Sequence, residues 1–283
     1  EYRYRHPILL NDTLFVTLSQ SGETADTVEA LKTAKIINNN ISTLCITNSA
    51  ESSLTRLSDL TFLTHAGPEI GVASTKAFTT QLVSLALLTC SIGKLKKTIN
   101  KSQEKEIVDG LKLLPGLINE ALLQENQIKK LAKDFKNKNS ALFLGRGTMY
   151  AIAMEGALKL KEISYIHAEA YPAGELKHGP IALIDKNMPV IAIAPNDELL
   201  SKLKSNLQEV KSRGSQMIVF EDENSKVEEM DSMEVIPVTS NLGRITAPVI
   251  FTIPLQLLSY HVALVKGTDI DKPRNLAKSV TVE

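Results

Sequence analysis

An internal repeat constrains the fold of this chain more than any other feature of its sequence. Three pairs of similar segments occur in the same order, each pair 173 to 175 positions apart: Phe15–Leu18 with Val190–Ile193, Ser42–Thr47 with Ser215–Phe220, and Gly71–Phe78 with Arg244–Phe251. The first two pairs are short apolar segments followed by helical patterns, and the third opens a long apolar helix. Strands that alternate with helices predict a parallel sheet covered on both faces. We therefore expect an α/β protein built from two copies of one three-layer α/β/α unit.

The second copy opens with a segment that has no counterpart in the first. Its predicted strand Ala141–Leu144 is followed by the turn Gly145–Gly147 and the helix Met149–Ser164. Subtracting the repeat offset places the equivalent segment before residue 1. We therefore expect the first copy to lack its opening strand, turn and helix, and the chain to be a piece of a longer protein.

Two further stretches are predicted to differ from the repeated units. Residues 96–139 are rich in Lys, Glu, Gln and Asn with regularly spaced Leu and Ile, which predicts connecting helices interrupted at Pro115-Gly116. Tyr165–Pro180 holds two His, two Glu, a Lys and two Tyr with little apolar periodicity. This second stretch is expected to be a loop that carries functional groups.

Composition excludes several classes of protein. The 32 Lys and Arg balance 32 Asp and Glu, so nothing favours binding to nucleic acid or an anionic membrane. Two cysteines, Cys45 and Cys90, make neither a disulfide framework nor a zinc site, and no secretory signal is visible. The apolar stretches Ala77–Gly93 and Ala247–Lys266 contain polar residues, so they are expected to be buried core or interface helices and not membrane spans. We expect a cytoplasmic protein.

The turn after the first strand is a candidate phosphate site. It contains Ser19, Gln20, Ser21 and Thr24 at the start of a helix, where hydroxyls and free N–H groups suit a phosphate monoester. An ordinary Ser or Thr helix cap is the alternative. The matching turn of the second copy, Ala194–Asp197, has no hydroxyl. This difference between the copies favours a phosphate site in the first.

Candidate catalytic groups follow the second copy's opening strand. Lys159 and Glu162 are three positions apart on one predicted helix face, and His178 lies in the stretch rich in titratable groups. A metal site of His167, Glu169 and His178 is not expected, because no H-E-x-x-H spacing or Cys partner supports it. A basic C-terminal tail carries Lys278. A base, an acid and a cation beside a phosphate cradle suit aldose–ketose isomerisation.

Four sequence runs carry a resemblance to a known family. They are Ser19–Thr27, Glu69–Phe78, Glu155–Pro180 and Pro273–Glu283. Together they resemble the isomerase half of the glutamine–fructose-6-phosphate aminotransferases, which consists of two tandem SIS (sugar isomerase) domains. The resemblance implies a first SIS domain at 1–97, a helical connector at 98–126, a second SIS domain at 127–268 and a tail at 269–283.

The same resemblance implies a function and its partners. It implies conversion of fructose 6-phosphate and ammonia to glucosamine 6-phosphate, the first step of amino-sugar synthesis, with no cofactor and no metal. The ammonia would come from glutamine through a separate N-terminal glutaminase domain, which this sequence does not contain. A homodimer with a shared active site is also implied.

Residue roles follow from the resemblance, position by position. Ser19, Gln20, Ser21 and Thr24 would hold the phosphate, and the residues contacting the sugar would be Val72, Ser74 and Ala277. Glu162 would move the proton between C1 and C2. His178 would open the sugar ring, reaching in from the neighbouring subunit. Lys278 and Lys159 would assist at the carbonyl and the amine.

Two other functions remain open at this point. A non-catalytic SIS module that senses sugar phosphates is one, although such a sensor does not need Glu162, His178 and Lys278 together. Another SIS isomerase is the second, and the Pro273–Glu283 run argues against it.

Overall fold

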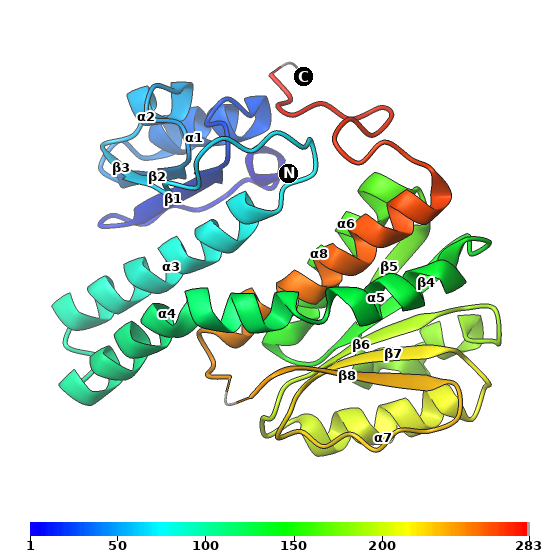
Figure 1. Ribbon diagram of the computed structural model, residues 1–283. Coiled ribbons are helices and arrows are strands. Elements are labelled where there is room, and N and C mark those ends of the chain that lie inside the picture. The colour runs from blue at the N-terminus through cyan, green and yellow to red at the C-terminus, as the bar shows by residue number, and fades with distance from the viewer. Residues whose placement is uncertain (241, 282–283) are drawn as a thin grey trace. The chain divides into compact units, whose positions relative to one another are not determined.

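The computed structural model describes residues 1–240 and 242–281 (Figure 1). Contacts divide the chain into two compact units. The first unit is residues 1–93 with 275–281, and the second is Lys94–Arg274. The domain and connector boundaries expected from the sequence stay predictions. Both sheets are parallel, and helices pack on them, so the predicted α/β class is confirmed.

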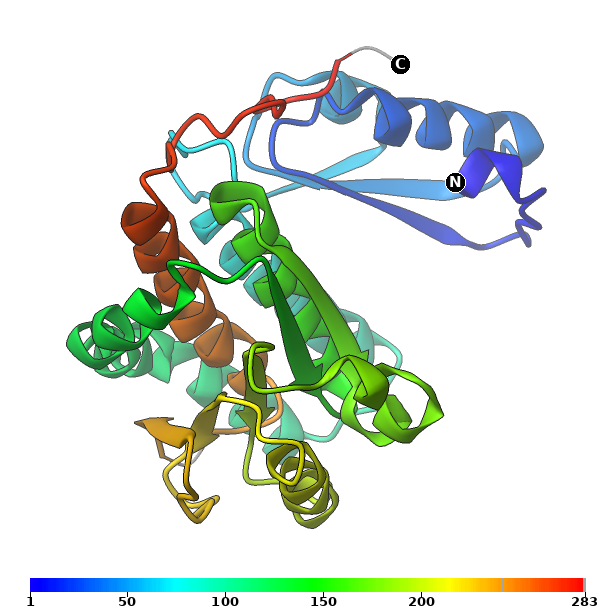
Figure 2. The same cartoon turned by 90° about the vertical axis from the view of Figure 1, so that its right-hand side faces the viewer.

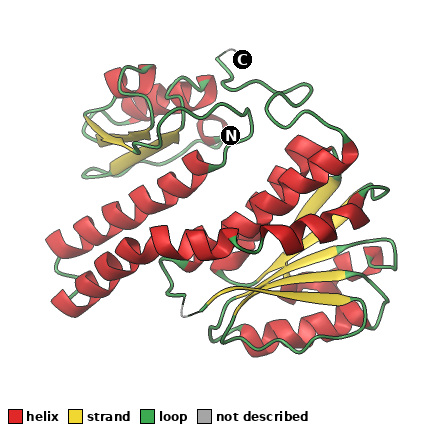
Figure 3. Cartoon of the chain, in the orientation of Figure 1, coloured by secondary structure: helices red, strands yellow, loops and turns green. Residues whose placement is uncertain are grey.

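The first unit holds a sheet of three parallel strands in the order β1-β2-β3 (Figure 3). Its elements are η1 (Tyr2–Tyr4), β1 (Leu14–Ser19), α1 (Ala25–Ile37), β2 (Ser42–Thr47), α2 (Ser53–Leu57), β3 (Leu60–Leu63) and α3 (Lys76–Leu95). Leu31 of α1, Cys45 of β2 and Leu54 of α2 are fully buried together. Apolar residues on one side of α1 thus fix it over the sheet, as the sequence pattern predicts.

The second unit holds five parallel strands in the order β5-β4-β6-β7-β8, which are labelled in Figure 1, and Figure 2 shows β4 and β5 side by side in green. Its elements are α4 (Lys101–Leu122), α5 (Glu125–Leu131), η2 (Ala132–Phe135), β4 (Ser140–Gly145), α6 (Thr148–Ser164), β5 (His167–Pro172), η3 (Ala173–His178), η4 (Pro180–Leu183), β6 (Val190–Ala194), α7 (Leu200–Lys211), β7 (Met217–Asp222), β8 (Met233–Thr239) and α8 (Ala247–Lys266). The strand order reverses direction at β4, which makes the carboxyl ends of β4 and β6 a topological switch point.

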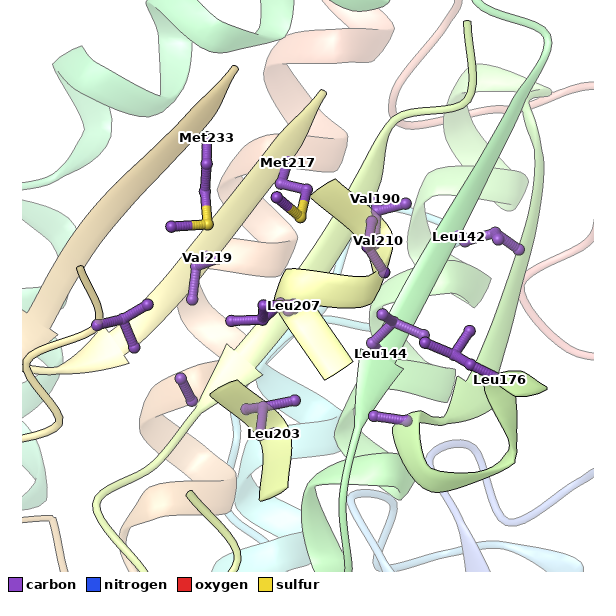
Figure 4. Close-up of a cluster of buried hydrophobic side chains, with 14 of the residues drawn as sticks. Leu142, Leu144, Leu176, Val190, Leu203, Leu207, Val210, Met217, Val219 and Met233 are labelled. Atoms are coloured by element: carbon purple, nitrogen blue, oxygen red, sulfur yellow. The ribbon is translucent and has the colours of Figure 1, made fainter. Parts of the chain in front are cut away.

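Side chains alternate between the two faces of the second sheet. On one face, Leu142, Leu144 and Val219 form a buried cluster with α7 residues such as Leu207 (Figure 4). On the other face, Phe143 contacts α6, and α6 packs against α8. Period-two alternation of this kind places a layer of helix on each side of a parallel sheet. The predicted three-layer arrangement is present in this unit.

Three expectations from the sequence are wrong. The stretch expected to be a loop contains β5, which pairs in parallel with β4. Pro115-Gly116 does not interrupt α4, because the helix runs from Lys101 to Leu122 through Pro115. A proline inside a helix sacrifices one hydrogen bond and strains one carbonyl, but flanking helical residues can hold it. The third wrong expectation is that α3 is a buried core helix.

The two long apolar helices differ in burial. Both α3 and α8 are long and apolar enough to cross a membrane by length and composition, but 61% of the apolar window of α8 is buried against 17% for α3. The sequence prediction of a buried core helix is confirmed for α8 and wrong for α3 over the part of the chain that the structure describes. An interface role for α3 stays a prediction.

Candidate functional site

The hydroxyl turn lies at the carboxyl end of β1, directly before α1. Ser19 Oγ accepts a hydrogen bond from the Gly22 amide at 3.0 Å and lies 3.0 Å from Thr24 Oγ1. Ser21 Oγ accepts from the Glu23 amide at 3.1 Å. Thr24 is the N-cap residue of α1, yet its side chain makes no capping bond. Thr24 therefore does not cap the helix with its side chain, and the hydroxyls of Ser19 and Thr24 lie against each other beside the helix N-terminus.

Two neighbours hold the turn in this shape. Gly22 has a φ of +70°, and a Cβ there would lie 2.0 Å from Ser52 Oγ, so only glycine fits. Glu23 accepts hydrogen bonds from the Ser53 amide and the Ser53 hydroxyl at 2.7 and 2.6 Å, and these bonds lower the pKa of the Glu23 carboxyl. The turn is thus tied to the first turn of α2. The carbonyl of Gln20 accepts from the Asn48 amide at 3.1 Å, which links it to the end of β2.

The C-terminal tail of the first unit closes on this turn. Ser279 Oγ lies 3.1 Å from Ser21 Oγ, and the Val280 carbonyl accepts from the Ala25 amide at 2.9 Å. Lys278 Nζ donates to the Gly71 carbonyl at 2.7 Å, immediately before Val72. The structure therefore brings Lys278 to the loop that precedes α3. In that loop Val72 and Ser74 are half-buried, while Ala277 of the tail is exposed.

Glu69 is a residue of this region that the sequence analysis missed as a site residue. Its side chain is 3% exposed and lies 3.4 Å from Lys278 Nζ. The same carboxylate accepts from the Thr75 amide at 2.6 Å and from the Thr75 hydroxyl at 2.9 Å. Burial alone would raise the pKa of Glu69, but these hydrogen bonds and the Lys278 charge lower it. Glu69 therefore anchors the lysine to the start of α3, which a local motif could not show.

A charged cluster lies on one face of α6 in the second unit. Lys159 is only 5% exposed and pairs closely with Glu162, whose side chain is 22% exposed. Glu155 lies one turn earlier, 10% exposed, with Oε1 at 3.5 Å from Lys159 Nζ. Burial raises the pKa of Glu155 to about 7, although the Lys159 charge acts against it. The predicted Lys159–Glu162 pair is present, and a second carboxyl shares the lysine.

Close packing fixes the helix that carries this cluster. A Cβ at Gly156 would lie 2.8 Å from Leu255 Cδ1 of α8 and 3.0 Å from Phe143 Cε1 of β4. Glycine therefore lets α6 fit between the sheet and α8. At the C-terminus of α6, the cap residue Tyr165 adopts a left-handed φ of +62°, and its hydroxyl accepts a hydrogen bond from the Arg274 amide at 2.8 Å. A rigid helix is a precise mount for an acid–base group.

His178 ends η3 and points away from the core. Its side chain is 74% exposed and lies 4.0 Å from Glu175. Within the described residues, no hydrogen bond or ion pair joins His178 to Glu162 or Lys159. The structure thus presents this histidine at the surface of its own unit.

The second unit has a cavity at the equivalent topological position. A cavity of about 340 Å³ lies at the carboxyl ends of its strands, with Gly147, Asn196, Asp197, Glu198 and Arg244 in its walls. Its β6 turn supplies two carboxylates in place of the serine hydroxyls, and Glu198 lies 3.0 Å from Arg244. Carboxylates repel a phosphate, so this pocket is the poorer anion site of the two.

Each unit carries groups of a different chemistry. In the first unit, hydroxyls and the N-terminus of α1 suit a phosphate. In the second unit, the Lys159–Glu162 pair supplies a carboxyl group beside an amine. A carboxylate can remove a proton from carbon next to a carbonyl, and a cation stabilises the enediolate that develops.

Sequence comparisons agree with this geometry. The SIS domain family model matches residues 1–91 and 134–266. The chain is 58% identical over all 283 residues to glutamine–fructose-6-phosphate aminotransferase [isomerizing] of Pseudomonas aeruginosa. Identity to the Escherichia coli K12 protein of the same name is 56%. The chain spans 46% of the length of each of these relatives, about half.

Structural comparisons give the same result. The C-terminal domain of glucosamine-fructose-6-phosphate aminotransferase from Francisella tularensis matches with a TM-score of 0.92 and 54% identity, covering 96% of this chain and 76% of that one. A glucosamine-6-phosphate deaminase from Thermotoga maritima matches with a TM-score of 0.78 and 25% identity, covering 99% and 79%. The chain therefore belongs to the SIS domain family, among the C-terminal domains of the glutamine–fructose-6-phosphate aminotransferases.

Proposed function

We propose that this chain isomerises fructose 6-phosphate and, with ammonia, forms glucosamine 6-phosphate. The observation that carries the proposal is the buried cluster on α6, in which Lys159 lies between Glu162 and Glu155. A lysine and two carboxyls that are largely removed from water are costly for stability alone. They are expected where a base of defined strength is needed.

In this proposal the first unit binds the phosphate and the second unit moves protons. Ser19, Ser21 and Thr24 with the Gln20 segment hold the phosphate ester, while Val72, Ser74 and Ala277 contact the sugar. The position of Lys278 at the Gly71 carbonyl supports this assignment, because it places an amine beside the Val72 loop.

Each proton transfer balances within the proposed site. His178 takes the proton from the anomeric hydroxyl and returns one to the ring oxygen, which opens the sugar. Ammonia adds to the C2 carbonyl and water leaves, with Lys278 and Lys159 assisting at the carbonyl and the amine. Glu162 then removes a proton from C1 and delivers it to C2, while the proton of the C1 hydroxyl passes to the imine nitrogen, giving the 2-amino aldose.

The proposal extends to partners and compartment. The curated relatives are about twice as long as this chain, which supports a separate glutaminase domain as the ammonia source. The exposure of His178 supports a homodimer in which each histidine serves the other subunit. Charge balance and buried cysteines support a cytoplasmic location.

A coupled assay tests the proposed function. The chain is incubated with fructose 6-phosphate without glutamine, and glucose 6-phosphate is followed by NADPH formation with glucose-6-phosphate dehydrogenase. We expect glucose 6-phosphate to form, and the Glu162→Gln variant to form it at least about 100-fold more slowly. Binding of fructose 6-phosphate without turnover would instead indicate a sugar-phosphate sensor.

A further inference from the structure

The segment that carries His178 is fixed from below by its own apolar residues. Ala173 and Leu176 of η3 are fully buried, and Leu176 belongs to the same cluster as Leu144 of β4 (Figure 4). Glu175 and His178 face outward from the same short helix, with exposed fractions of 63% and 74%. Burial of Ala173 and Leu176 holds one side of η3 against the sheet, and a polar contact can add to what fixes its orientation.

Arg146 supplies such a contact from the turn after β4. Its guanidinium lies against the backbone of η3: a Cβ built at Gly174 would be 3.0 Å from Nη2 and 3.3 Å from Cζ. Nη1 donates to Asn206 Oδ1 at 2.7 Å, and Asn206 is a buried residue of α7. The guanidinium is therefore wedged between η3 and α7, and it meets η3 at Gly174, four residues before His178.

An arginine is specifically suited to this position. A guanidinium is a rigid plane that can lie flat on a backbone while donating at its edge. Lysine keeps the charge but has neither the plane nor the fixed donor geometry. Lys177 and Glu209, 2.8 Å apart, make a second link from η3 to α7, but Lys177 is 65% exposed, and exposed ion pairs fix geometry weakly.

We propose that Arg146, through Gly174 and Asn206, is a positioning residue that orients His178 for opening the sugar ring. The inference rests on the proposed function, because it takes fructose 6-phosphate as the substrate and His178 as the ring-opening group. It adds a residue from the turn after β4, one that is assigned no contact with the sugar or the phosphate.

A substrate that needs no ring opening separates positioning from general damage. 5-Deoxyfructose 6-phosphate lacks the hydroxyl that closes the furanose ring, and its O6 is esterified, so it exists as the open-chain ketone. Its isomerisation still needs the phosphate turn and Glu162. Loss of ring opening therefore slows fructose 6-phosphate alone, whereas damage to the rest of the site slows both sugars.

The experiment measures kcat and KM for both sugars in Arg146→Lys, with His178→Ala as the reference. We expect kcat for fructose 6-phosphate to fall about 10- to 100-fold, as for a misplaced catalytic group, and kcat for the 5-deoxy sugar to stay within twofold. Arg213→Lys is the matched control, because Arg213 is an exposed arginine beyond α7 that bonds the Glu209 carbonyl at 2.5 Å. It should leave both sugars unchanged.

A second variant covers the case in which Arg146→Lys does not fold. Gly174→Ala keeps every charge and pushes the guanidinium aside, because its Cβ meets Nη2 at 3.0 Å; it should show the same selective loss. Suppose that His178→Ala slows fructose 6-phosphate selectively. Equal loss of kcat on both sugars, or no loss on either, in Arg146→Lys or in Gly174→Ala would then overturn the inference about Arg146 and leave the proposed function standing. If His178→Ala slows both sugars equally, the ring-opening role in the proposed function is wrong as well, and the inference falls with it.

Discussion

At the scale of single residues, three serine and threonine hydroxyls set the first unit apart from the second. Ser19, Ser21 and Thr24 gather at the end of β1, while the matching turn after β6 exposes Asp197 and Glu198. Two copies of one fold thus differ in the charge and donors at the same topological position. The difference supports the proposal that the phosphate binds in the first copy.

Ser21→Ala should weaken sugar-phosphate binding about tenfold or more, because one hydrogen bond to a charged group contributes about 1.5–3 kcal/mol. Calorimetric titration with glucosamine 6-phosphate measures the change. Ser279→Ala is the control, since it removes the same Ser21–Ser279 contact but leaves the turn intact. An unchanged dissociation constant for Ser21→Ala would place the phosphate elsewhere.

Glu155 gives a prediction about pH. Its pKa is raised to about 7 in the folded chain from 4.5, so the folded state holds this proton more tightly than the unfolded state. The contribution of this proton to the free energy of unfolding is complete below pH 4.5 and is lost as the pH rises through 7. Glu155→Gln removes this loss, so the variant should gain stability relative to wild type between pH 5.5 and 8.

Thermal unfolding of wild type and Glu155→Gln at pH 5.5 and at pH 8 measures the gain in stability of the variant. A relative change of ~1 kcal/mol shifts Tm by roughly 2–4 °C for a chain of this size, so a shift of that order is expected. Glu169→Gln is the control, because hydrogen bonding from Tyr171 lowers the pKa of Glu169 and it stays ionised throughout this range. A Tm difference for Glu155→Gln that does not vary with pH would contradict the account.

At the scale of elements, most strands and helices follow from apolar periodicity. The predicted strand at Ala141–Leu144 and the predicted helix at Met149–Ser164 correspond closely to β4 and α6. β5 was missed because its sequence, His167–Pro172, carries titratable groups where a buried strand carries apolar ones. It is an edge strand of the sheet, so water satisfies the polar side chains that a central strand would exclude.

The candidate site also has a part that the sequence predicts and a part that it does not. The positions of Ser19, Ser21, Lys159 and Glu162 could be predicted because each lies in a short motif beside a predicted element, and their roles stay predictions. The contacts Arg146–Asn206 and Glu69–Lys278 join residues 60 and 209 positions apart. No local pattern encodes such contacts, since they depend on how the elements pack.

Gly156 connects packing to the site. Gly156→Ala gains up to about 1 kcal/mol of helix propensity, but its Cβ would lie 2.8 Å from Leu255, and overpacking typically costs about 1–3 kcal/mol. We expect a net loss of stability and slower isomerisation, because α6 carries Lys159 and Glu162. Gly116→Ala in α4 is the control: its Cβ would meet nothing within 4 Å, so denaturant unfolding should show it to be stabilised. A stabilised Gly156→Ala would mean that α6 can shift freely.

At the scale of the whole molecule, the proposed function assigns His178 of one subunit to the Glu162 of its partner. Glu162→Gln and His178→Ala chains with different tags can be co-expressed and the heterodimer isolated by two affinity steps. In a two-fold dimer with shared sites, one site then carries both substitutions and the other carries none, so about half of the wild-type activity should return. A heterodimer as inactive as each parent would place all groups within one subunit.

The most direct test of the central claim follows hydrogen exchange at carbon in deuterated water. If Glu162 carries the proton between C1 and C2, wild-type protein should introduce solvent deuterium into the sugar phosphate. Glu162→Gln should abolish this exchange while keeping affinity for fructose 6-phosphate within a few-fold. Exchange at the wild-type rate in Glu162→Gln, with loss of exchange in Glu155→Gln or Glu175→Gln, would show that another carboxylate is the base.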